Sequence, residues 1–79
     1  MKKEDLPDKL IEVLKALGGR GTILEICKKF WEINGKYLDE RNDLFYTWQY
    51  DIRWAATELR KQKIMKSKDV SPKGIWELS

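Results

Sequence analysis

The chain has 79 residues, a formal net charge of +3, one cysteine and no histidine. This is the composition of one small folded domain, and its length leaves no room for a second. It excludes an intramolecular disulfide, a Cys/His zinc cluster and a histidine general base, and no apolar run approaches the roughly 20 residues of a membrane span.

The first predicted element is a helix over residues 7–17. Its apolar side chains recur at helical spacing: Leu6, Leu10, Val13, Leu14 and Leu17. Pro7 is tolerated in a first turn, and Gly18-Gly19 is typical of a helix end. Arg20 to Thr22 is long enough only for a bridge or a brief edge strand.

A second helix is predicted to begin after Thr22. The Thr22 hydroxyl can accept from the amide of Glu25, while the Glu25 carboxylate accepts from the amide of Thr22, which is a capping box. The buried stripe of this helix comprises Ile23, Ile26, Phe30 and Ile33. Asn34-Gly35 is expected to stop it, so that residues 36–43 form a connecting loop with room for one helical turn.

The third predicted helix, residues 44–63, is the longest element because neither proline nor glycine interrupts it. Its inward arc contains Phe45, Trp48, Ile52, Ala55, Ala56 and Leu59. After Lys63 the period changes. Residues 64–66, 67–73 and 74–78 read as strand, turn and strand, with Trp76 and Leu78 facing the core.

Three helices followed by a hairpin is the element order of a winged helix-turn-helix. The sequence therefore predicts a single domain, residues 1–79, of the α+β class and mainly α, with the C-terminal hairpin as the wing. In that architecture the third helix can enter the major groove of DNA while the wing touches the flanking backbone.

The positive charge is concentrated near the C-terminus. Residues 60–73 contain a single acidic residue, Asp69, against six basic ones: Arg60, Lys61, Lys63, Lys66, Lys68 and Lys73. A local field of this kind attracts a polyanion, whereas its alternative reading is a solvated helix end and turn.

The final third also resembles a known family. The segments Asp51-Ile52-Arg53-Trp54-Ala55, Leu59-Arg60-Lys61, Ile64-Met65 and Ser71-Pro72-Lys73-Gly74-Ile75-Trp76-Glu77-Leu78 are similar to the N-terminal domain of Mrr-type restriction endonucleases. Here the wing is one residue shorter before its glycine, and Gln62-Lys63 stands where Ala-Gly is common. The family's nuclease domain has no counterpart among these residues, so the resemblance implies a winged helix that binds DNA.

The candidate DNA-binding residues lie on the third helix and the hairpin: Thr47, Tyr50, Arg53, Thr57, Lys61, Lys66, Lys68, Ser71 and Lys73. Arg53 can read a guanine bidentately or clamp a phosphate, and both readings stay open. Thr47 and Tyr50 can donate to phosphate oxygens, and the lysines suit phosphate contacts that carry no sequence preference. A solvated face in which Arg53 contacts Asp51 or Thr57 is the alternative.

Three apolar side chains suggest a competing function. Leu24 and Trp31 are two helical turns apart and can form an exposed stripe, unless the loop with Tyr37 and Leu38 folds over them. Trp54 lies opposite the buried arc, so we expect it to pack on the wing or the first helix rather than to stack on a base. A winged helix that binds a protein or dimerises through the Leu24/Trp31 or Trp54 face is the alternative to DNA binding.

We expect a binding protein and not an enzyme, because no pair of carboxylates has the spacing of a metal or catalytic site. The expected partner is double-stranded DNA, with a homodimer or protein partner left open. No cofactor, metal, membrane or small-molecule substrate is expected. The lone cysteine and the absence of a signal peptide indicate a cytoplasmic protein, either a small regulator or the DNA-binding module of a restriction-type system.

Overall fold

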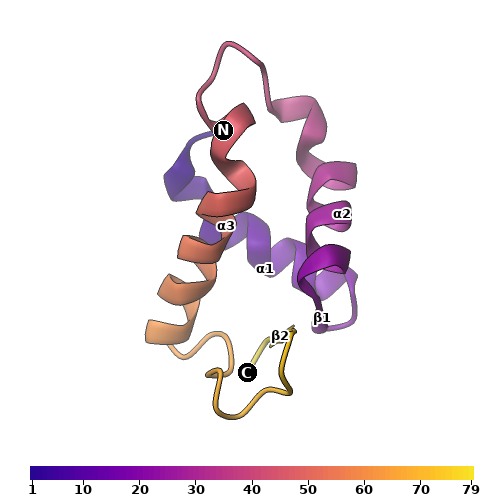
Figure 1. Ribbon diagram of the computed structural model, residues 1–79, viewed down its shortest axis with the longest axis vertical. Coiled ribbons are helices and arrows are strands. Elements are labelled where there is room, and N and C mark those ends of the chain that lie inside the picture. Colours follow the sequence, from indigo (N-terminus) through magenta and orange to yellow (C-terminus); the bar gives the residue numbers. More distant parts are fainter.

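The fold consists of three helices and a two-stranded antiparallel sheet, seen in a computed structural model that describes residues 1–79. In Figure 1, α2 and α3 stand on either side, α1 crosses behind them, and the sheet lies at the end where α3 finishes. The elements are η1 (Lys3–Asp5), α1 (Leu6–Ala16), β1 (Arg20–Thr22), α2 (Ile23–Asn34), η2 (Gly35–Tyr37), α3 (Leu44–Lys61) and β2 (Ile75–Glu77). The predicted mainly helical α+β class is confirmed.

The structure contains the local interactions that were expected to begin and end the first two helices. Gly18 and Gly19 have φ values of 84° and 99°, a left-handed backbone that favours glycine and ends α1. At the start of α2 the capping box is formed, with the Glu25 amide 3.1 Å from Thr22 Oγ1 and the Thr22 amide 2.9 Å from Glu25 Oε1. The predicted bridge between the two helices is strand β1.

Helix α3 begins at the predicted residue but ends at Lys61 instead of Lys63. The reason is the backbone of Lys63, whose φ of 62° cannot continue a right-handed helix. The amide of Ile64 then donates to the Leu59 carbonyl at 2.9 Å, which closes the helix end. We call residues 62–74, which follow, the C-terminal loop.

The predicted strand over residues 64–66 is wrong. Met65 forms only a single bridge with Leu78, flanked by hydrogen bonds from the Lys66 amide to the Glu77 carbonyl and from the Ser79 amide to the Ile64 carbonyl. Beyond this bridge the C-terminal loop turns back on itself, because the amides of both Val70 and Ser71 donate to the Ser67 carbonyl. A tight turn at that point draws the loop away from a ladder with β2.

The partner of β2 is instead β1, the short segment between α1 and α2. Their antiparallel register pairs Arg20 with Glu77, Gly21 with Trp76 and Thr22 with Ile75. The Leu78 amide extends this contact by donating to the Gly19 carbonyl at 2.9 Å. The last residues of the chain are thereby attached to the connection between the first two helices.

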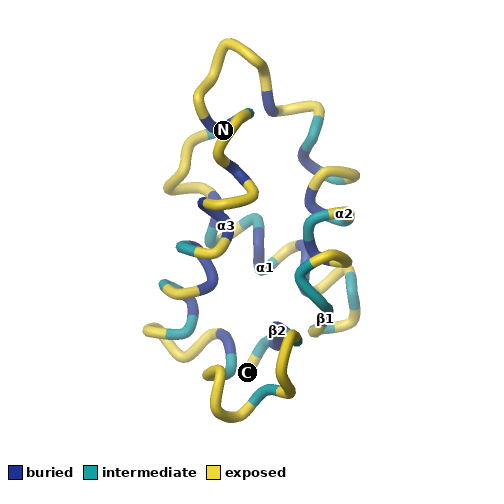
Figure 2. The backbone as a smooth tube through the Cα atoms, in the orientation of Figure 1, coloured by how far each residue is buried: buried dark blue, intermediate teal, exposed yellow.

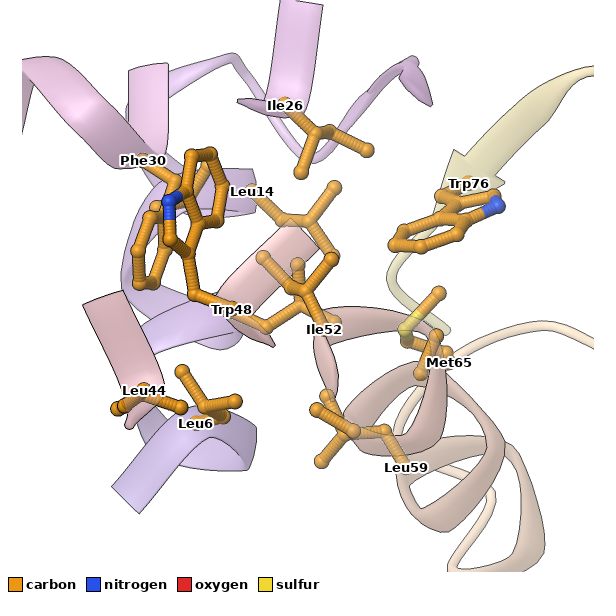
Figure 3. Packing of buried hydrophobic residues seen from close by; sticks show 14 of the residues in the cluster. Leu6, Leu14, Ile26, Phe30, Leu44, Trp48, Ile52, Leu59, Met65 and Trp76 are labelled. Carbon is orange, nitrogen blue, oxygen red and sulfur yellow. The ribbon is translucent and has the colours of Figure 1, made fainter. Parts of the chain in front are cut away.

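The core lies between the three helices and is closed at one end by Trp76. In Figure 3 the Phe30 and Trp48 rings lie face to face, with centroids 4.7 Å apart and planes at 16°. The buried apolar residues are Leu6, Leu10, Val13, Leu14, Ile26, Phe30, Leu38, Leu44, Trp48, Ile52, Ala55, Ala56, Leu59, Met65 and Trp76. The predicted stripes are therefore inside, with Leu17, Ile23, Ile33, Phe45 and Leu78 half-buried at their margins.

The first prediction concerns Trp76. Its removal leaves a large cavity between β2 and the helices, so we expect Trp76→Ala to lower the free energy of unfolding by about 3–5 kcal/mol. Chemical denaturation measures this change. The exposed loop residue Val70 supplies the control, since Val70→Ala should change stability by less than about 0.5 kcal/mol. Equal stability of the two variants would contradict the assignment of Trp76 to the core.

The second prediction concerns the capping box. Thr22→Ala should cost about 1 kcal/mol, because it leaves an amide at the start of α2 without its acceptor. Hydrogen bonds from Thr22 hold the pKa of Glu25 below its ordinary value. The stabilisation by Glu25 is therefore present above the carboxyl's unfolded-state pKa and is lost as the pH falls through the lowered pKa.

We expect the stability difference between wild type and Glu25→Gln to shrink over that acidic range when unfolding is followed by circular dichroism. A difference that stays constant with pH would show that the carboxylate does not cap α2.

Candidate nucleic-acid interface

The exposed side of α3 carries the predicted DNA-contacting residues at helical spacing. Tyr50, Arg53 and Thr57 are exposed, as the pattern predicts, and Tyr50 has 77% of its surface accessible. The Thr57 hydroxyl donates to the Arg53 carbonyl at 3.1 Å, a bond within the helix that leaves the guanidinium free. Figure 2 shows the same alternation along α3, with exposed and buried segments following one another.

Thr47 lies on α3 but its hydroxyl hydrogen is already used. Thr47 Oγ1 lies 2.7 Å from Asp51 Oδ2, and Asp51 is buried with its other oxygen 4.0 Å from Lys3 Nζ. Because a hydroxyl has one hydrogen, a donor bond from Thr47 to a phosphate would have to break this contact. The contact between Arg53 and Asp51, part of the alternative reading, is absent, since Asp51 faces Thr47 and Lys3 instead.

The structure gathers several other predicted residues around one hollow of about 410 Å³. This hollow lies between the C-terminal half of α3, the first residue of α2, the C-terminal loop and strand β2. Its walls comprise Ile23, Arg53, Thr57, Arg60, Lys68, Pro72, Lys73, Gly74, Ile75 and Trp76. It therefore contains four cationic side chains and no carboxylate, and we call it the basic hollow.

The cations of the basic hollow have no ion-pair partner, in contrast to the neighbouring Lys61 and Lys66. Arg53, Arg60, Lys68 and Lys73 take part in none of the salt bridges of the chain, which are Lys3–Asp51, Lys9–Glu12, Lys29–Glu32, Arg41–Asp39, Lys61–Glu58 and Lys66–Glu77. Their charge is therefore uncompensated within the protein. The predicted site residues thus divide into free and paired cations.

Two of the predicted lysines belong to the paired group. Lys66 Nζ lies 3.3 Å from Glu77 Oε2, and the Glu77 side chain is nearly buried at the end of β2. Lys61 Nζ lies 4.0 Å from Glu58 Oε1 on the solvent side of α3, and Lys61 does not line the hollow. The sequence does not separate Lys66 from the free lysines, because Glu77 is eleven residues away, whereas Glu58 and Lys61 have the i,i+3 spacing of neighbours on a helix.

Arg60 is the residue of the hollow that the sequence-based site prediction missed. Its guanidinium lies over the Trp76 ring, 5.5 Å from the centroid, and its Nε is enclosed without a hydrogen-bond acceptor. Burial lowers the pKa of Arg60 from its usual value. The sequence feature that could have identified Arg60 is its position two helical turns after Arg53, which places both residues on one face of α3.

Ser71 is half-buried in the C-terminal loop, and its hydroxyl oxygen is enclosed without a hydrogen-bond partner. It does not line the basic hollow, in contrast to Lys68 and Lys73 on either side. The predicted turn is present, because the Ile75 amide donates to the Pro72 carbonyl and Gly74 has a φ of 79°. Only a residue that tolerates this backbone allows the loop to turn back toward β2 here.

A second, apolar groove of about 530 Å³ lies between α2 and α3. Its lining comprises Leu24, Cys27, Lys28, Trp31, Phe45, Trp48 and Gln49. The expectation that the loop covers this stripe is wrong, since Leu24 is 63% and Trp31 46% exposed. Leu38 enters the core instead, which draws the loop to the end of the helices and away from Leu24.

Trp54 is half-buried against the core, as expected for a structural role. Lys3 Nζ in η1, the turn that precedes α1, lies 4.8 Å from the ring centroid. The segment before α1 therefore contributes to its cover, which the sequence did not indicate. Cys27 is also half-buried, and burial raises the pKa of its thiol, against the opposing charge of Arg53.

Comparison with known proteins gives no match: no family model, no curated protein and no solved structure is similar to the chain. None of the helices combines the length and apolar character that crossing a lipid bilayer requires. No three histidine, cysteine or acidic side chains come together in a way that could hold a metal ion. The resemblance to Mrr-type domains therefore stays a prediction that rests on the quoted residues.

Proposed function

We propose that the protein binds double-stranded DNA as a winged helix-turn-helix domain. The observation that carries this proposal is the convergence of four unpaired cations, from α3 and from the C-terminal loop, on one hollow without a carboxylate. Phosphates are the ligands that such a surface attracts most strongly, and each one bound releases counterions from the duplex. Arginine and lysine from two separate elements allow two separate contacts along the DNA.

The arrangement of the elements supports a winged-helix reading. In it, α2 and α3 form the helix-turn-helix, and residues 62–78 form the wing with its attachment to β1. The left-handed φ of Lys63 adds support to the resemblance with Mrr-type domains, because that family commonly has a glycine at this position. We therefore propose a small regulator or the DNA-binding module of a restriction-type system.

In the proposed complex, the exposed face of α3 enters the major groove. That groove is about 12 Å wide and accepts a helix with its side chains. Tyr50, Arg53 and Thr57 then face the base edges and the groove walls, while Lys68 and Lys73 reach the adjacent backbone. The buried Asp51 stays on the side of α3 that faces Lys3 in η1, so its charge does not oppose the DNA.

The second candidate function is protein binding through the apolar groove. The exposed Leu24 and Trp31 beside Phe45 favour it, because exposed apolar side chains that line one groove are typical of interaction sites. The two candidates differ in their response to salt. DNA binding weakens steeply as the salt concentration rises, whereas an apolar interface is nearly insensitive.

The deciding experiment is an amide NMR titration with a random-sequence duplex at two ionic strengths. DNA binding predicts shifts along α3 and the C-terminal loop that diminish at the higher salt concentration. If the wild type shows no salt-sensitive duplex binding, the DNA proposal fails and the apolar groove becomes the leading site.

The third prediction concerns the lysines of the C-terminal loop. Replacing Lys68 and Lys73 with alanine should weaken binding to all duplex sequences about equally. The slope of log K against log salt should fall in magnitude by about 0.9 for each phosphate contact that is lost. Fluorescence anisotropy at several salt concentrations measures both effects. Lys28→Ala, on α2 and outside the hollow, is the matched control and should leave the slope nearly unchanged.

The fourth prediction concerns Arg53, for which two outcomes remain distinct. If Arg53 reads a base, Arg53→Ala should reduce discrimination between sites by about 1–3 kcal/mol while non-specific affinity changes less. If Arg53 clamps a phosphate, the variant should behave as the lysine variants do. Binding measured against a library of duplexes separates the two, and wild-type affinity in Arg53→Ala would exclude both.

A further inference from the structure

The basic hollow contains one cation whose position is fixed before any ligand binds. Lys68, Lys73 and Arg53 are exposed, whereas Arg60 is half-buried with its guanidinium over the Trp76 ring. Trp76 is itself held by pairing with Gly21 across the sheet. Arg60 is therefore anchored to the core through a single aromatic contact, while the lysines have free stems.

The surroundings of Arg60 leave its charge without a partner. Its Nε is enclosed and has no acceptor, and the lining of the same hollow includes the apolar side chains of Ile23, Pro72 and Ile75. An ionised group in partly apolar surroundings loses hydration, and an anion restores the lost interaction more effectively there than in open solvent. Three further cations and no carboxylate line the same hollow, so an anion bound there meets positive charge from several side chains.

We propose that the basic hollow is a preformed seat for one phosphate group, and that Arg60 fixes the position of this phosphate. The proposal rests on the proposed DNA binding for the source of the phosphate, a phosphodiester of the duplex backbone. The guanidinium supplies a planar pair of donors for the phosphate oxygens. Lys68 and Lys73 approach the same phosphate from two positions of the C-terminal loop.

This arrangement gives the phosphate a second role, because the residues around it belong to different elements. Arg53 and Arg60 belong to α3, and the lysines belong to the C-terminal loop. A phosphate that Arg60 and the two lysines contact joins the loop to α3. The seat therefore sets the register of α3 along the duplex in addition to providing affinity.

The test compares two neutralisations at adjacent positions of α3. Arg60→Gln and Lys61→Gln each remove one positive charge, but Lys61 faces solvent and pairs with Glu58. Loss of a charged hydrogen bond at a seat should weaken duplex binding by about 10- to 100-fold in Arg60→Gln. Loss of a solvent-exposed charge should cost less than about threefold in Lys61→Gln. Equal losses in the two variants would overturn the seat while leaving DNA binding intact.

Arg60→Lys provides the conservative variant. It keeps the charge but lacks the planar pair of donors, so we expect it to recover only part of the affinity lost in Arg60→Gln. Full recovery would show that the charge alone matters and would overturn the role of Arg60 in fixing the phosphate. Thermal unfolding of each variant shows whether the domain is folded under the conditions of the binding assay.

A measurement on the wild type tests the seat independently of any substitution. Inorganic phosphate, compared with chloride at equal ionic strength, should shift the NMR signals of the Arg60 Nε–H and the Trp76 indole N–H. Shifts with a duplex lacking terminal phosphates identify the backbone as the source. Shifts with inorganic phosphate but no duplex binding would keep the seat for a free phosphate compound and refute the proposed DNA binding. No shift with either probe would overturn the seat.

Discussion

The pairing of β2 with β1 places Trp76 opposite Gly21, and both the core and the basic hollow depend on this contact. Gly21 is buried, and a side chain there would begin 3.0 Å from a methyl group of Leu17. A glycine thus lets the connection between α1 and α2 lie close to the helices, with the indole of Trp76 across from it. Arg60 lies over the ring of the same Trp76, so one side chain closes the core and orients a functional arginine.

Helix α1 is the element against which α2 and α3 both pack, while those two helices meet each other through large aromatic rings. Trp48 stacks on Phe30 and on Trp31, whose centroid is 6.1 Å away. Rings of this size hold α2 and α3 apart along the outer side of the domain. The apolar groove is the consequence of that separation, since nothing in the chain extends over Leu24 and Trp31.

The basic residues around the C-terminal loop differ in whether an acidic side chain pairs with them. Lys66 beside the nearly buried Glu77 stabilises the attachment of the C-terminal loop, and its charge is largely compensated there. The charges around the basic hollow have no acidic partner; they belong to Arg53, Arg60, Lys68 and Lys73. A polyanion is therefore attracted most strongly to this part of the surface. The net charge of +3 therefore understates the field on this side of the molecule.

The sequence by itself determined the local elements. Apolar periodicity located the three helices to within two residues, and the Thr22–Glu25 spacing determined a cap because both partners lie within one helical turn. The tertiary structure decided everything that depends on distant partners: that β2 pairs with β1 and not with residues 64–66, that Glu77 neutralises Lys66, and that Trp76 orients Arg60. Periodicity records only which way a side chain points along its own element. The identity of the group that meets it depends on how the elements pack, and this is a property of the whole chain.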